Sequence, residues 1–176
     1  MADETKEPWL NYLALSTIIL AVCATLATFK GGGYSTRSVL RQSQASDRWA
    51  HYQAKSIKGN LYELQRDTLT LDLKTEARGR HSEELSLALA ESAKRIAKYD
   101  GEKAQIFKEA QKLESERDDA SRHSQAFGMA VIFLQIAILL SSVAALMKKK
   151  PVWLAGVLVG AVGLLCFANG FFLFLG

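Results

Sequence analysis

The chain has 176 residues, of which 49% are hydrophobic and 23% charged, and its formal net charge is +4. These averages conceal a segregated sequence, because uncharged apolar runs occupy both ends and most charges lie between them. This pattern argues against an ordinary soluble core, since nothing else in the chain is apolar enough to bury three such runs.

The first predicted element is a transmembrane helix at residues 9–29, which follows a short N-terminal tail at residues 1–8. The run "WLNYLALSTIILAVCATLATF" carries no charge and exceeds the roughly 18 to 20 residues that span a bilayer. A cleaved signal peptide is the alternative. The tail "MADETKEP" argues against it, because acids outnumber basic residues there and the apolar run is longer than a signal peptide requires.

Residues 30–125 predict an extramembrane helical hairpin, because this stretch contains no proline and few glycines. The run "KGGG" is expected to end the first span and permit a bend, and Gly79 is expected to separate the two arms. The arms, about 35–78 and 82–125, have equal lengths. We therefore expect an antiparallel pair that leaves the membrane and returns to it.

Heptad spacing in both arms predicts that the hairpin is a coiled coil. The stripe in the second arm alternates steps of four and three over Leu85, Leu89, Ser92, Ile96, Tyr99, Lys103, Ile106, Ala110, Leu113, Arg117, Ala120, Ser124 and Phe127. It runs into the next apolar segment, which predicts one long helix from 82 to 147. A weaker stripe in the first arm comprises Ala50, Ala54, Ile57, Leu61, Leu64, Thr68 and Leu71.

The aromatic and basic stretch "WAHYQAKSIKGNLYE", residues 49–63, lies beside the first-arm stripe. On an upright helix it would face the returning arm, another subunit, or both; on a helix lying flat it could rest on anionic headgroups. We favour the upright arrangement. The residues predicted to form a partner or subunit interface are Trp49, Tyr52, Ile57, Leu61, Leu64, Ile96, Tyr99, Ile106 and Leu113.

Two further transmembrane helices are predicted at 126–147 and 152–176, joined by a basic loop at 148–151. Small residues and amides inside these spans usually mark contacts between helices. The predicted packing residues are Gln135, Gly156, Gly160, Gly163 and Asn169. The alternative is that the two amides line a pore.

The loop "KKKP" predicts the orientation, because short cytoplasmic loops are enriched in Lys and Arg. The N-terminus and this loop would then be cytoplasmic, and the hairpin would be periplasmic in a bacterial inner membrane. Lys30, Arg37 and Arg41 give the opposite signal, but they flank a long loop, where the rule is weaker.

Chemical sites are not indicated. His51, His81 and His123 lack ligands at metal spacing, and Cys23 and Cys166 lie in apolar runs, where they predict packing. We find no phosphate-binding loop or nucleophile motif, and we expect no catalytic residue, metal or cofactor. Nucleic-acid binding is not expected either, because basic residues are interspersed with acids and no known fold signature occurs.

Three stretches, "WLNYLALSTIILAVCATLATF", "ASDRWAHYQAKSIKGNLYE" and "FLQIAILLSSVAALMKKKPVW", resemble the bacterial domain-of-unknown-function family 4337 in sequence and order. The most specific part is the core from Trp49 to Lys58. The resemblance covers nearly the whole chain. It implies a bacterial membrane protein of this layout, and it supplies no activity or catalytic residues.

The functional expectation is an all-α integral membrane protein with three spans, in contact with membrane lipids. It is expected to be a non-enzymatic, homo-oligomeric scaffold or assembly factor. One alternative is an accessory subunit that binds an unrelated partner in a larger membrane enzyme or transporter complex. Another is a channel formed by the oligomer.

Overall fold

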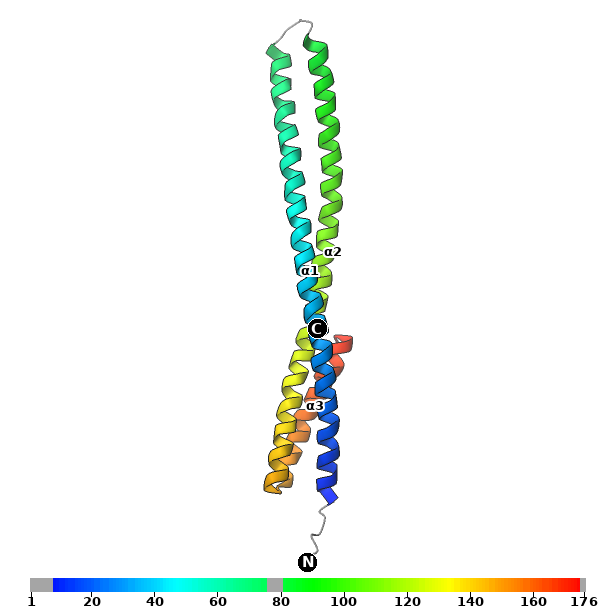
Figure 1. Ribbon diagram of the computed structural model, residues 1–176, viewed down its shortest axis with the longest axis vertical. Helices are drawn as coiled ribbons and strands as arrows, with labels where there is room; N and C mark the ends of the chain where they lie inside the picture. Colours follow the sequence, from blue (N-terminus) through cyan, green and yellow to red (C-terminus); the bar gives the residue numbers. More distant parts are fainter. Residues whose placement is uncertain (1–7, 76–80, 175–176) are drawn as a thin grey trace, which may run out of the picture. The chain divides into compact units, whose positions relative to one another are not determined.

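The computed structural model describes residues 8–75 and 81–174, and within these ranges the chain forms three helices and no strand (Figure 1). Helix α1 spans Pro8–Thr75, α2 spans His81–Met147 and α3 spans Lys150–Phe172. Each contains a segment long and apolar enough to cross a membrane. These features are those of a membrane protein.

Helix α1 continues through the glycine run at 31–33, where we expected the first span to end. Glycine weakens a helix by only about 1 kcal/mol per residue, and Gly31 is used for close packing. A Cβ at Gly31 would lie 3.0 Å from the Phe127 Cβ, and the Ser124 hydroxyl donates a hydrogen bond to the Gly31 carbonyl at 3.2 Å. The glycine therefore permits a close approach of α2 while α1 remains helical. The break expected at Gly79 lies outside the described residues.

Helix α2 is continuous from the charged region into its apolar end, as the heptad stripe predicts. A tight turn joins it to α3, with Lys148 at a φ of 52°. Pro151 follows at the start of α3, where the missing N–H removes no helical hydrogen bond. At the other end, Leu173 adopts the left-handed conformation and its N–H donates to the Asn169 carbonyl at 2.8 Å.

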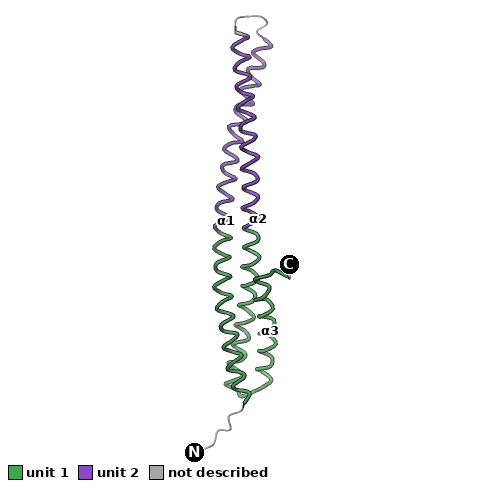
Figure 2. The backbone as a smooth tube through the Cα atoms, turned by 90° about the vertical axis from the view of Figure 1, so that its right-hand side faces the viewer, with its two compact units in different colours: residues 1–39, 117–176 green, residues 40–116 purple. Residues whose placement is uncertain are grey.

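The chain divides into two compact units (Figure 2). Unit 1, residues 1–39 and 117–176, contains α3 and the apolar parts of α1 and α2. One buried cluster in this unit alternates large and small side chains, which lets helices approach closely; it comprises Leu20, Ala24, Ala27, Phe127, Ala130, Leu134 and Ala137. A second cluster contains Trp9, Leu13 and Ala144.

In unit 2, residues 40–116, a segment of α1 lies beside a segment of α2 (Figures 1 and 2). Three ion pairs join them at regular intervals: Arg41–Glu116, Arg48–Glu109 and Lys55–Glu102. As the residue number rises by seven along α1, it falls by seven along α2 (41, 48, 55 against 116, 109, 102). The heptad interval keeps one face of α1 against α2.

Candidate interaction surfaces

In unit 2, the face of α1 directed at α2 combines small, aromatic and basic side chains. Ala45 is buried, and Trp49 donates a hydrogen bond from Nε1 to Glu114 Oε1 at 2.9 Å. The Trp49 ring packs edge-on against Tyr52 and against Phe107 of α2, with centroid distances of 5.7 and 5.4 Å. The structure therefore directs Trp49 and Tyr52 toward α2 of the same chain.

The same face continues with two tyrosines and a glycine. Tyr62 stacks on Tyr99 of α2 at 5.7 Å, and the Tyr62 hydroxyl accepts a hydrogen bond from Arg95 at 2.6 Å. A Cβ at Gly59 would lie 3.8 Å from the Tyr99 Cβ, and Lys55 lies over the Tyr99 ring at 5.4 Å. The helices thus contact each other through aromatic rings and charged side chains, with a glycine between them.

The predicted interface residues of α2 lie on the surface that faces α1. Ile106 is 6% exposed, and Ile96, Tyr99 and Leu113 are half-buried. They belong to the heptad stripe of α2, along which every residue with a described exposure is buried or half-buried.

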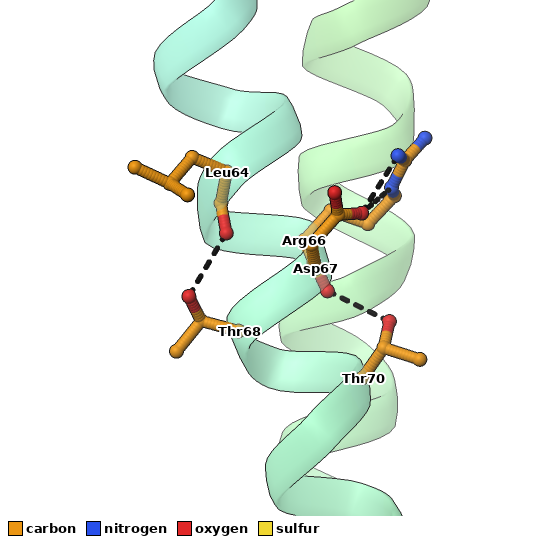
Figure 3. A network of polar contacts seen from close by, with 5 residues as sticks. All are labelled: Leu64, Arg66, Asp67, Thr68 and Thr70. Atoms are coloured by element: carbon orange, nitrogen blue, oxygen red, sulfur yellow. Dashed lines mark hydrogen bonds and ion pairs between the residues drawn. The ribbon is translucent and has the colours of Figure 1, made fainter.

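The apolar stripe of α1 lies on a different face from the one that contacts α2, so within the single chain its large residues stay exposed. Five large residues on this face are 54% to 65% exposed, and we call them the outer stripe: Leu40, Ile57, Leu61, Leu64 and Leu71. Figure 3 shows the Leu64 side chain directed away from α2. Ala50, Ala54 and Thr68 of the predicted stripe are exposed as well.

The face of α1 that contacts α2 is determined by steric fit and by charge as well as by hydrophobicity. Basic residues of α1 meet glutamates of α2, and Ala45 and Gly59 allow the helices to approach. Polar side chains near Leu64 form their hydrogen bonds within α1 itself. The Thr68 and Thr70 hydroxyls donate to the carbonyls of Leu64 and Arg66 at 2.9 and 2.7 Å (Figure 3).

Ion pairing shifts pKa values in unit 2, among them those of Glu102 and Lys103. The hydrogen bond from Lys55 is the largest cause of a lowered pKa of the Glu102 carboxyl, which partial desolvation opposes. The hydrogen bond to Asp100 raises the pKa of Lys103. Since the folded chain lowers the pKa of Glu102, the stability from its carboxylate is present above the ordinary carboxyl pKa. That stability is lost as the pH falls through the lowered value.

Replacing Lys55 with glutamine is expected to raise the pKa of Glu102 toward its ordinary value, because the strongest partner of the carboxylate is removed. NMR titration of the labelled glutamate side chains measures this directly. Lys58→Gln removes the same charge from an exposed neighbouring position and is the matched control. An unchanged Glu102 titration in Lys55→Gln, or the same shift in both variants, would contradict the assignment.

In unit 1, α3 packs through glycines on both other helices. A Cβ at Gly160 would lie 3.0 Å from Leu20 of α1, and a Cβ at Gly163 would lie 2.9 Å from Leu134 of α2. Gly156 is also buried, where a Cβ would meet the Ala137 carbonyl at 3.2 Å. All three predicted glycines therefore lie at helix contacts.

The two predicted amides lie in different surroundings. Asn169 is half-buried, and its carbonyl accepts the hydrogen bond that ends α3. Gln135 is exposed. It shares the outer face of α2 with Gly128, where an added Cβ would meet nothing within 4 Å, and with Leu139 and Ser142.

His123, which seemed isolated in the sequence, joins all three helices of unit 1. Its ring stacks on Tyr34 of α1 at 4.5 Å, and its Nδ1 lies 2.8 Å from the Gly170 carbonyl of α3. Sequence reasoning missed this contact because one partner is a backbone carbonyl, which no residue type reveals. Among the described residues, no group of three or more His, Cys, Asp or Glu side chains could hold a metal ion.

Comparison with known proteins identifies a family. The family model described as Domain of unknown function (DUF4337) matches residues 9–173, nearly the whole chain, so the chain belongs to this family. This agrees with the resemblance of the three quoted stretches. No match was found among curated proteins or among solved structures.

Proposed function

We propose that this member of the DUF4337 family is a multi-pass protein of the bacterial inner membrane whose hairpins assemble into a homo-oligomeric scaffold. The apolar ends of α1 and α2, together with α3, cross the bilayer, and residues 40–116 form an antiparallel helical hairpin in the periplasm. The antiparallel pairing is supported by the three ion pairs, in which the residue number rises along α1 while it falls along α2. Support for the orientation comes from the lysines at 148–150.

The observation that carries the scaffold is the outer stripe. One face of α1 packs against α2, yet the five large apolar residues of the outer stripe stay exposed. A row of such residues at heptad spacing is a binding surface for another helix. Copies anchored in one membrane present this stripe at the same height, so a second copy is the partner that fits it.

The exposed Gln135 supports contact between copies within the bilayer. An amide in hydrocarbon is stabilised when it forms hydrogen bonds across helices. Every copy has the same orientation, so Gln135 residues of neighbouring copies lie at equal depth and can pair with each other. Gly128 and Ser142 on this face would let two α2 helices approach closely.

Extraction in mild detergent, followed by the mass and composition of the particles, tests the scaffold. Several copies of this one chain are the expected result. A particle with an unrelated chain at fixed stoichiometry would instead indicate an accessory subunit, and single copies at the native concentration would reject assembly. Conduction of ions by the homo-oligomer in liposomes would indicate a channel.

A further inference from the structure

A groove with two cations lies on α1 where its uncharged apolar segment ends. Its volume is about 680 Å³, and Lys30, Gly32, Gly33 and Arg37 line it, with Phe29 at its apolar end. Neither the hairpin seam nor the glycine contacts of α3 involve these residues. All of them belong to unit 1.

The floor of this groove is free of side chains. A Cβ added to Gly32 or Gly33 would meet nothing within 4 Å. A Cβ added to Gly31, in contrast, would lie 3.0 Å from the Phe127 Cβ. Since packing within the described chain explains only the first of the three glycines, the other two leave open space beside the helix backbone.

The two cations of the groove have no ion-pair partner among the described residues. No Asp or Glu occurs between residues 8 and 46, and within the described residues neither Lys30 nor Arg37 forms an ion pair. Arg41, the next cation, is neutralised by Glu116 at 2.8 Å. Lys30 and Arg37 are seven residues apart, so they share one side of the helix, about 10 Å apart along its axis. Two long cationic side chains can converge on one phosphate across that distance.

We infer that this groove binds the phosphate of an anionic phospholipid headgroup, with Lys30 and Arg37 on the phosphate and Phe29 among the acyl chains. The inference rests on the proposed membrane insertion, which places the end of the apolar run at the headgroup level. Phe29 is 78% exposed on the apolar side of the groove, which favours a lipid over a free anion. Each cation near an anionic lipid surface strengthens binding about fivefold.

Native mass spectrometry of the purified full chain tests the site with equal amounts of phosphatidylglycerol and phosphatidylcholine. Wild type is expected to retain phosphatidylglycerol preferentially. Lys30→Gln with Arg37→Gln should reduce that preference at least fivefold and leave phosphatidylcholine retention unchanged. Lys58→Gln with Lys74→Gln, which removes two charges from exposed positions elsewhere on α1, should retain the preference.

A second variant blocks the groove without altering charge. Gly33→Leu places a side chain in open space and is expected to lower phosphatidylglycerol retention while the helical circular dichroism signal stays the same. Equal retention of the two lipids by wild type, or no effect of the Lys30/Arg37 substitutions, would overturn the site. Displacement of the lipid by millimolar inorganic phosphate would assign it to a free anion and overturn the lipid proposal.

Membrane insertion is measured separately, by resistance of the chain to carbonate extraction. A chain that resists extraction but shows no lipid preference refutes the headgroup site alone. A chain released by carbonate refutes the proposed membrane topology itself.

Discussion

Replacing Leu61 and Leu64 with aspartate is expected to convert the proposed oligomer to smaller species. The dissociation constant of the oligomer should rise about 100-fold or more. Both side chains lie on the outer stripe and are at least 60% exposed in the single chain. Their burial against another copy would contribute about 1.5 to 3 kcal/mol each, and two aspartates would bring like charges together. Sedimentation equilibrium in detergent measures the change.

The matched control is Gln53→Asp with Asn60→Asp, which adds the same charge at two exposed positions on a flank of the same helix. Because these positions lie off the outer stripe, assembly is expected to persist. Unfolding of the paired α1 and α2 segments would lower helical circular dichroism in the Leu61/Leu64 variant, whereas loss of assembly alone would leave it intact. An unchanged particle mass in that variant would refute the interface.

Substitutions in the heptad stripe of α2 test the pairing of α1 with α2 rather than assembly, because the residues of this stripe already face α1. Ile106 is buried within the single chain, so an aspartate there would disturb the pairing of α1 with α2 before it affected any contact between copies. The distinction between an inner face and an outer stripe therefore decides which variants report on assembly.

The sequence predicted the three apolar segments and the long second helix, because both depend on patterns along a single element. A heptad stripe that continues into an uncharged run leaves no position for a helix to end, and α2 continues from His81 to Met147. The three glycines of α3 were also identified as packing residues. Their spacing of four and three residues places them on one side of the helix.

The face of α1 that contacts α2 could not be predicted in the same way. Hydrophobicity ranks Ile57, Leu61 and Leu64 above Ala45 and Gly59, but contact between two helices also depends on how closely the backbones approach and which charges meet. The Trp49–Glu114 hydrogen bond and the Lys55–Glu102 pair join residues remote in sequence, and a single helix pattern carries no information about them. The same limit applies to His123 and the Gly170 carbonyl.

The continuity of α1 through its glycine run has a related cause. Glycine permits a bend, but whether a bend forms depends on what the neighbouring helix provides, and here Phe127 and Ser124 contact Gly31 directly. Local conformational freedom and tertiary packing thus predict opposite outcomes from the same residues.

Gly163→Ala is expected to destabilise the helix packing of unit 1 by about 1 to 3 kcal/mol, the usual effect of an extra methyl group in a well-packed site. The new Cβ would lie 2.9 Å from Leu134 Cγ and 3.0 Å from the Leu134 backbone nitrogen. A leucine side chain can rotate away, but the backbone nitrogen cannot move without shifting α2. Thermal unfolding in detergent, followed by circular dichroism, should show a lower midpoint.

Gly101→Ala is the matched control, since it adds the same methyl group to α2 where nothing lies within 4 Å and where we propose no contact between copies. Alanine also favours the helix over glycine by about 1 kcal/mol, so this variant should unfold at the same temperature as wild type or higher. Both substitutions gain that propensity, and any difference between them therefore measures the steric contact alone. Equal midpoints would mean that α3 does not pack on Leu134 through Gly163, whereas a lower midpoint for Gly163→Ala alone would establish that this contact stabilises the packing of α3 on α2.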